Sequence, residues 1–166
     1  MESNWYAVYV RSRHEFKVHS ALLAKGIESF LPVVERLRQW KDRKKLVPFP
    51  LFPGYLFVKI PNDKVYFLQV LKINGVVKIL GDSYGYQPVD DDQILSIYKM
   101  VTSKLPIDEH PYLKKGQKVK IISGPLSGVQ GILESKGAEH HVVVSVDILQ
   151  KGVSVKVNID DIEPVI

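Results

Sequence analysis

Few residues of this 166-residue chain have the types and spacing that covalent or metal chemistry requires. The histidine pair His140–His141 lies in a predicted strand, where adjacent side chains point to opposite faces and cannot easily share one metal ion. The carboxylates of Asp90–Asp92 open a predicted helix, whose dipole they offset without any cation. The segment Gly81–Gly85 has the composition of a turn, and no base or oxyanion partner can be placed beside its serine. We therefore expect no enzyme, no catalytic residue, no metal site and no cofactor.

Basic residues gather in two short segments, which are the candidate nucleic-acid contacts. Between Arg36 and Lys45 six residues are basic and one is acidic, and Trp40 lies among them. Basic side chains neutralise phosphates, and an aromatic side chain can stack on a base. A second group lies where a predicted strand meets a predicted helix, whose N-terminus also favours phosphate. A solubilising, solvated turn is the alternative interpretation of each. The residues are Arg11, Arg13, His14 and Lys17 in one group, and Arg36, Arg38, Trp40, Lys41, Arg43, Lys44 and Lys45 in the other.

Aromatic residues concentrate in the proline-rich segment that follows the basic run. Its prolines fix the entry into a predicted strand in which Tyr55 and Phe57 share one face, while Leu56 and Val58 share the other. We expect Leu56 and Val58 to be buried against helices. Tyr55 and Phe57, with Phe52 just before them, form either part of the core or an exposed apolar groove that a partner covers.

Composition and charge limit the class of protein. Hydrophobic residues make up 45% and charged residues 25%, which is typical of a folded chain, and there is no cysteine. The absence of cysteine favours a reducing cytoplasm as the location. The apolar runs are too short to span a bilayer, so we expect no membrane segment. Residues 1–105 contain 16 basic and 10 acidic residues, a net charge of +6, whereas residues 106–166 contain 7 and 8, a net charge of −1. Contacts with a polyanion are therefore expected in the first part of the chain.

The first 105 residues predict a mixture of strands and helices. Ser12 with Glu15, and Asp90 with Gln93, have capping-box spacing and each predict the start of a helix. Gly26 should end the first helix. The expected order is strand 5–11, a helix to Lys25, strands 30–39, 46–49 and 55–60, helix 63–71, strand 76–80, and a helix from Asp90 that buries Ile94, Ile97 and Val101. This order indicates an α+β sandwich with an antiparallel sheet covered by helices.

The last part of the chain predicts strands alone. Apolar and polar residues alternate in several runs, with glycine-bearing turns between them. We expect about five short strands in a small closed barrel, because closure removes unpaired edges. Pro106 and Pro111 bracket a short charged segment that predicts a linker. The expected domains are residues 1–105 and 112–166, with the linker at 106–111.

Several motifs together resemble the NusG family of transcription elongation factors. The segment Lys115–Leu133, in which a strand is followed by a Gly-Pro turn and a glycine that opens the next strand, is similar to the KOW motif. Trp5-Tyr6, Pro50–Val58 and Asn74–Val76 match the family in order and spacing. Two further segments, Arg11–Glu15 and Arg38–Lys45, resemble the specialised paralogues, which include RfaH and the UpxY-type antiterminators.

The resemblance implies an N-terminal NGN-type α/β sandwich and a C-terminal SH3-like KOW barrel. It implies a monomer that docks on the clamp helices of the largest RNA polymerase subunit, touches the non-template DNA strand, and suppresses pausing and termination, at specific operons such as polysaccharide clusters. The polymerase-binding residues would be Tyr9, Phe52, Tyr55, Phe57 and Ile79. Lys72 and Asn74 would join Arg11, Arg13, His14 and Lys17 in binding DNA. The KOW domain would recruit a small-subunit ribosomal protein or the termination factor Rho.

Some positions depart from the family pattern. Tyr66-Phe67-Leu68 falls where RfaH has a His-Thr-Thr contact to the opposite side of the polymerase cleft, so we expect a different or weaker contact there, with Tyr66 and Phe67 as its candidate residues. Val129 and Leu149 fall on family aromatics in the KOW domain, and with Leu126 they are the candidate partner contacts. The alternative function is that of an RNA-binding or ribosome-associated KOW protein without a polymerase role. That function needs a basic barrel, whereas this half of the chain has a net charge of −1.

Overall fold

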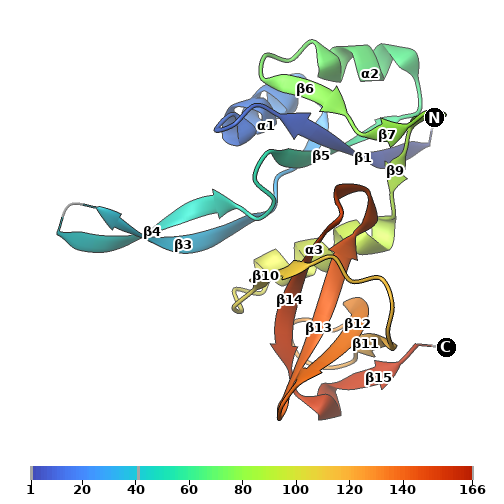
Figure 1. Ribbon diagram of the computed structural model, residues 1–166. Helices are drawn as coiled ribbons and strands as arrows, with labels where there is room; N and C mark the ends of the chain where they lie inside the picture. The colour runs from blue at the N-terminus through green and yellow to red at the C-terminus, as the bar shows by residue number, and fades with distance from the viewer. Residues whose placement is uncertain (1, 41, 166) are drawn as a thin grey trace. The chain divides into compact units, whose positions relative to one another are not determined.

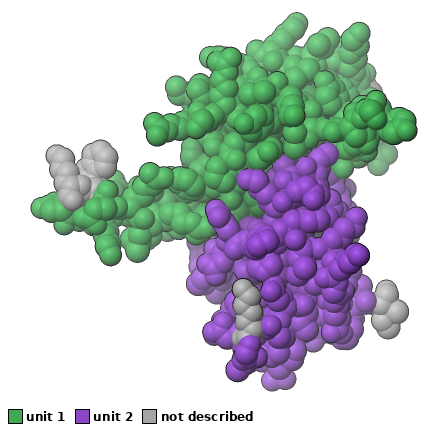
Figure 2. Space-filling view, viewed as in Figure 1, with its two compact units in different colours: residues 1–88 green, residues 89–166 purple. Residues whose placement is uncertain are grey.

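The computed structural model describes residues 2–40 and 42–165, apart from the side chains of Trp40 and Lys136. The chain forms two compact units, residues 1–88 and residues 89–166 (Figure 2). The sequence predicts the boundary at residues 105–112, so the division lies earlier than expected. The difference is a single helix, Asp91–Thr102, which belongs to the second unit. The segment 106–111, expected as a linker, contains the strand β10 (Asp108–Pro111).

The first unit is built on an antiparallel sheet (Figure 1). Its strands lie in the order β2-β5-β1-β6, and the register places Tyr6 opposite Val58 at the centre. β9 (Pro88–Val89) also pairs with β1. The strands are β1 (Ser3–Val10), β2 (Glu28–Phe30), β5 (Tyr55–Pro61) and β6 (Val76–Ile79). Two helices lie between these strands in the chain, which confirms the mixed α+β class predicted from the sequence.

Two helices, α1 (Glu15–Ala24) and α2 (Lys64–Leu71), cover one face of this sheet. Leu56 and Val58 of β5 are fully buried, and the same core cluster contains Leu22 of α1 and Val70 of α2. This confirms the prediction for Leu56 and Val58. Each such side chain stabilises the fold by about 1.5–3 kcal/mol through removal of apolar surface from water. The core thus fixes β1 and β5 beside each other.

The start of α1 differs from the predicted capping box. His14 is the N-cap residue, and no side chain caps the helix; Ser12 lies outside it. The Glu15 side chain is buried and accepts a hydrogen bond of 2.9 Å from the backbone N–H of Gly54. The carboxylate is used in a long-range contact because Gly54 approaches the helix start. The helix ends as predicted, with Gly26 just beyond it at φ = +76°.

The Glu15–Gly54 bond predicts a measurable stability effect. Glu15→Ala would leave the Gly54 N–H without its acceptor, at a cost of about 1–3 kcal/mol to the unfolding free energy of the first unit. Urea unfolding monitored by tryptophan fluorescence follows this unit, because both tryptophans of the chain lie in it. Glu28→Ala removes an exposed carboxylate and serves as the control. Equal unfolding midpoints for the two variants would contradict the assigned role.

Two small ribbons complete the first unit. β3 (Val33–Trp40) and β4 (Arg43–Pro50) pair with each other and form a two-stranded ribbon that extends away from the main sheet (Figure 1). β7 (Gly81–Asp82) and β8 (Gly85–Tyr86) form a second, short one. The segment Gly81–Gly85 is therefore a turn, as predicted, and Asp82 accepts a hydrogen bond from the Tyr84 N–H across it.

The second unit combines one helix, α3 (Asp91–Thr102), with an antiparallel sheet of six strands. The pairing runs in the order β10-β14-β13-β12-β11-β15. Short 3₁₀ turns at Asp147–Leu149 and Ile159–Asp161 follow β13 and β14. Besides β10, the strands are β11 (Lys118–Ile121), β12 (Gln130–Lys136), β13 (Glu139–Val146), β14 (Lys151–Val157) and β15 (Ile162–Pro164). In the described part of the chain, no helix is long and apolar enough to cross a membrane.

Candidate functional site

A pair of tyrosines lies at the end of the two central strands of the first unit. Tyr9 of β1 stands directly opposite Tyr55 of β5, and their ring centroids are 5.2 Å apart. Tyr9 is 37% exposed. The neighbouring Gly54 has φ = +89°, and a Cβ there would lie 3.2 Å from the Tyr9 ring. Glycine therefore lets the turn pass beneath the ring, and we call Tyr9 and Tyr55 the tyrosine pair.

The other apolar residues of the predicted docking surface are buried. Phe52, Phe57 and Ile79 are each exposed by less than 5%. The Phe57 ring packs against Phe30 at a centroid distance of 6.1 Å and against Phe52 at 6.4 Å. Strand alternation predicted correctly that Tyr55 and Phe57 share a face. It did not reveal that only the end of this face reaches the surface, because that depends on the residues packed over its middle.

Helix α2 carries the two residues expected to reach a second contact. Phe67 is buried, with its ring 5.1 Å from that of Tyr6 and 4.6 Å from that of Tyr86, so it belongs to the core. Tyr66 is partly buried and packs against the same core. The apolar side chains that α2 exposes are Val65 and Leu68, at 60% and 42%. The sequence comparison placed Leu68 at this contact but missed Val65. Helical periodicity could have found Val65, because it is three residues from Leu68 and out of phase with Phe67 and Val70.

Two loops form a basic cluster at the start of α1. The backbone N–H of Arg11 donates to the carbonyl of Gly75 over 2.8 Å. A Cβ at Gly75 would lie 3.1 Å from the His14 ring, so this residue must be small for the two loops to meet. The loop after α2 thereby joins the loop before α1. The structure brings together the six predicted residues Arg11, Arg13, His14, Lys17, Lys72 and Asn74, which we call the loop cluster; all but the partly buried His14 are exposed.

Another histidine on α1 does not add to the charge of the loop cluster. His19 lies with its Nδ1 atom 2.8 Å from the Ser29 hydroxyl. Partial burial lowers the pKa of His19 below its ordinary value, because burial disfavours the charged imidazolium. The lowered pKa favours the neutral imidazole of His19 near pH 7.

The second basic segment occupies the β3–β4 ribbon. Arg36 and Arg38 lie on β3, and Arg43, Lys44 and Lys45 lie on β4. The backbone of Trp40 pairs with Arg43 at the far end of the ribbon. Lys41 and the side chain of Trp40 lie outside the described parts of the structure. The guanidinium of Arg38 lies 5.0 Å from the centroid of the Phe49 ring, a cation–π arrangement.

The candidate partner contacts of the second unit are buried. Leu126, Val129 and Leu149 are each exposed by 6% or less, so they pack inside the unit. The Nζ atom of Lys99, on α3, donates to the carbonyl of Ser127 at 2.9 Å, between the first two of these residues. These three residues were selected as contacts because they are apolar, and they belong to the core instead. A single sequence does not show which apolar positions of a small sheet face outward.

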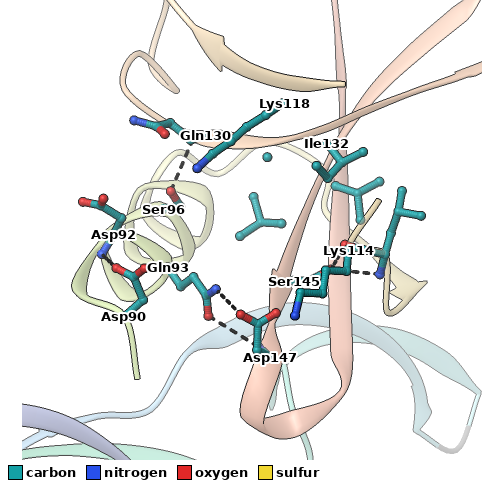
Figure 3. A pocket seen from close by; sticks show the side chains of 14 residues that line it. Asp90, Asp92, Gln93, Ser96, Lys114, Lys118, Gln130, Ile132, Ser145 and Asp147 are labelled. Atoms are coloured by element: carbon teal, nitrogen blue, oxygen red, sulfur yellow. Dashed lines mark hydrogen bonds between the residues drawn. The ribbon is translucent and has the colours of Figure 1, made fainter. Parts of the chain in front are cut away.

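Helix α3 packs on β12 and β13 through apolar side chains, with hydrogen bonds between polar side chains at the edge of the contact (Figure 3). Gln93 donates to the Asp147 carboxylate at 3.0 Å, and Ser96 accepts from the Gln130 N–H at 3.4 Å. The pocket between helix and sheet is about 210 Å³ in volume.

The start of α3 agrees in part with the predicted capping box. Asp90 caps the helix by accepting from the Asp92 N–H, whereas the Gln93 side chain bonds to Asp147 and not to the N-cap residue. The buried face consists of Ile94, Ser96, Ile97 and Met100, whereas Val101 is only partly buried.

The histidines of the second unit bind neighbouring side chains. His140 lies 3.0 Å from the Ser135 hydroxyl, and His141 lies 3.3 Å from the Glu139 carboxylate. Lys156 also pairs with Glu139 and, with His141, lowers the pKa of that carboxyl. His110 pairs with Glu134. Among the residues that the structure describes, no group of three or more His, Asp or Glu side chains is placed to hold a metal ion.

The first unit thus has the tyrosine pair beside a basic loop on an α+β scaffold, and the second unit is rich in strands. A family model described as "Transcription termination factor nusG" matches residues 3–98. The chain therefore belongs to the NusG family and is a transcription factor of the termination and antitermination class.

Relatives extend the similarity to both units. The NusG termination/antitermination protein of Borreliella burgdorferi is 24% identical over 99% of this chain and its own full length. That of Bacillus subtilis is 30% identical over 81% of this chain and 82% of its own, and Spt5 of Acidianus ambivalens is 29% identical over 98% and 94%. A solved structure titled "Domain interaction in Thermotoga maritima NusG" covers 100% of this chain and 99% of its own, with a TM-score of 0.55 at 24% identity. That likeness supports the fold.

Proposed function

We propose that this protein binds RNA polymerase and non-template DNA and suppresses pausing and termination during elongation. The tyrosine pair docks on an apolar surface of the polymerase clamp, and the loop cluster contacts the exposed DNA strand. The observation that carries the proposal is the continuity of these two surfaces. Tyr9 lies on β1, and Arg11 lies two residues later in the loop that follows it. Between them, the Val10 N–H donates to the carbonyl of Gly54, and the Arg11 N–H donates to the carbonyl of Gly75.

The chemistry of the two surfaces supports different partners. Aromatic side chains with apolar rings and polar hydroxyls are frequent anchors in protein interfaces. Arginine and lysine side chains around a helix N-terminus favour phosphate, and an exposed asparagine such as Asn74 can hydrogen-bond to a base. A protein contact and a nucleic-acid contact side by side match the junction between a polymerase surface and the DNA strand that it displaces.

The second unit has a separate role in the proposal. By analogy with the NusG family, the second unit would recruit a small-subunit ribosomal protein or Rho. The residues named for that contact are buried, so the contact would use the exposed surface of the unit.

The central experiment measures elongation with purified components. Core polymerase is stalled at a defined pause on a DNA template, and the lifetime of the pause is compared with and without the intact chain. We expect the chain to co-elute with core polymerase and to shorten the pause. A chain that leaves pause lifetimes unchanged and does not co-elute with core polymerase would contradict the proposal.

The loop cluster predicts a specific loss of DNA contact. Replacing Arg11, Arg13 and Lys17 by glutamine should lower the salt dependence of binding to single-stranded DNA by about 0.7 per lost phosphate contact, or about 2 in total. Recruitment to a paused complex should weaken, and any sequence preference should diminish. The measurement is fluorescence anisotropy over a range of salt concentrations. Lys25→Gln, at the other end of α1, is the control, and an equal effect of this substitution would contradict the assignment.

A further inference from the structure

The β3–β4 ribbon has two chemically different faces, which its register defines. Residues directly opposite each other on antiparallel strands project to the same side, and successive residues project to opposite sides. Arg38 stands opposite Lys45. Lys44 stands opposite Gln39, on the other side of the ribbon. The residues that share the side of Arg38 and Lys45 include Arg36 and Arg43, and we call these four residues the basic face.

On the two strands of the ribbon, no carboxylate shares the side of the basic face. Glu35 stands opposite Pro48 and therefore projects to the other side, together with Lys44. The ion pairs found among the described residues all lie in the second unit. Arg38, Arg43 and Lys45 are exposed, and Arg36 is partly buried. Four of the five described cations between residues 36 and 45 thus lie on one side of a narrow ribbon.

The other face carries exposed leucines and no net charge. Leu37 stands directly opposite Leu46, and these side chains are 65% and 55% exposed. The charged residues of this face are one cation, Lys44, and one carboxylate, Glu35, whereas the basic face has four cations. This difference in net charge indicates that the two sides meet different surroundings.

The shape of the basic face suits a duplex. Side chains on one side of a strand recur every two residues, about 6.6 Å apart. The major groove of B-DNA, about 12 Å wide, admits a two-stranded ribbon, whereas that of A-form RNA is deep and narrow. Proteins that grip single strands use aromatic platforms. The aromatic residues that the register places on this face are Phe49 and Trp40, and the side chain of Trp40 lies outside the described parts. The Phe49 ring is paired with the guanidinium of Arg38, so at this position the side chain presented to a ligand is the cation.

We propose that the basic face of the β3–β4 ribbon binds the phosphate backbone of duplex DNA. Arg36, Arg38, Arg43 and Lys45 neutralise phosphates along a groove, and Lys44 takes no part. This is a second DNA contact, in addition to the loop cluster of the proposed function, and it does not require the polymerase. Its test therefore uses the intact chain and DNA alone.

The decisive comparison is between two adjacent lysines. Lys44→Gln and Lys45→Gln remove the same charge from neighbouring positions on opposite faces. Fluorescence anisotropy with a labelled random-sequence duplex of about two helical turns, at salt concentrations between about 50 and 200 mM, gives the salt slope of binding. We expect Lys45→Gln to lower the slope by about 0.9, Arg38→Gln with Lys45→Gln to lower it by about 1.8, and Lys44→Gln to leave it unchanged.

Several outcomes would overturn the proposal. Equal losses for Lys44→Gln and Lys45→Gln would show that net charge and not the face determines binding, and no loss for either would assign the ribbon to another role. Tighter binding of the same-length single strand or duplex RNA would reject duplex DNA as the ligand. The comparison is repeated in the variant that lacks the charges of Arg11, Arg13 and Lys17. Persistence of the Lys44–Lys45 difference there would support the basic face even if the loop cluster or polymerase binding failed its own test.

Discussion

Binding to core RNA polymerase should be almost abolished when Tyr9 and Tyr55 are both replaced by alanine. The two rings lie 5.2 Å apart, so one partner surface can cover both. Aromatic anchors of protein interfaces commonly contribute about 2 kcal/mol or more each, which corresponds to at least about a 30-fold loss of affinity per side chain. The affinity is measured by biolayer interferometry with immobilised chain and purified core enzyme.

The control for this experiment is another exposed tyrosine of the same unit. Tyr84 lies in the turn between β7 and β8 and is 93% exposed, and Tyr84→Ala should leave the affinity unchanged. Near-ultraviolet circular dichroism checks that the double variant is folded. A folded double variant that binds polymerase as tightly as the parent would show that docking uses another surface, and Val65 and Leu68 of α2 would be the next residues to test.

The second large effect concerns the helix that belongs to the second unit. Ile97 of α3 is fully buried, so Ile97→Ala should lower the unfolding free energy of that unit by about 2–5 kcal/mol. This is a large fraction of the total for a small domain. Hydrogen exchange of the backbone amides of Val142–Val146 on β13, against which α3 packs, measures this unit directly.

The first unit provides an internal comparison. Trp5 and Trp40 are the two tryptophans of the chain, so tryptophan fluorescence follows the first unit alone. Ile97→Ala should leave that unfolding transition in place while it accelerates exchange in β13. Leu95→Ala, on the exposed side of the same helix, should affect neither. A shifted tryptophan transition with unchanged exchange in β13 would show that α3 stabilises the first unit instead.

Much of the fold follows from local patterns. Period-2 alternation placed Leu56 and Val58 on one face of β5, and the structure buries both. Gly26 lies just beyond α1 in the left-handed region, and Asp90 caps α3. These features depend on a few neighbouring residues, and a single sequence contains that information. The loop cluster was also anticipated as a set, although the bond from Arg11 to Gly75 that assembles it was not.

The remainder depends on contacts between distant residues. The periodicity of α3 shows that one side of the helix must be buried, but not which surface covers it. Phe57 and Val129 were candidate partner contacts, but both side chains are buried. Apolar residues form cores as well as docking surfaces, so the residue type alone does not distinguish the two. Lys44 and Lys45 point to opposite sides because β4 includes both residues, whereas the sequence predicted a strand that begins at residue 46. Placing Arg38 on the side of Lys45 requires the register of β3 against β4, which the sequence does not state.

The two hydrogen bonds of Gly54 have a consequence for how partners influence each other. Its carbonyl accepts from Val10 and its N–H donates to Glu15, so one peptide segment joins the strand that carries Tyr9 to the first residue of the helix beside Arg13 and Lys17. A ligand that alters this turn at the tyrosine pair also alters the helix start. In the proposed function, binding at the two surfaces would then be linked thermodynamically, and whatever affinity one partner gained from the presence of the other would be gained equally in return. Substitutions at Tyr9 and at Arg11 consequently do not report on two independent sites.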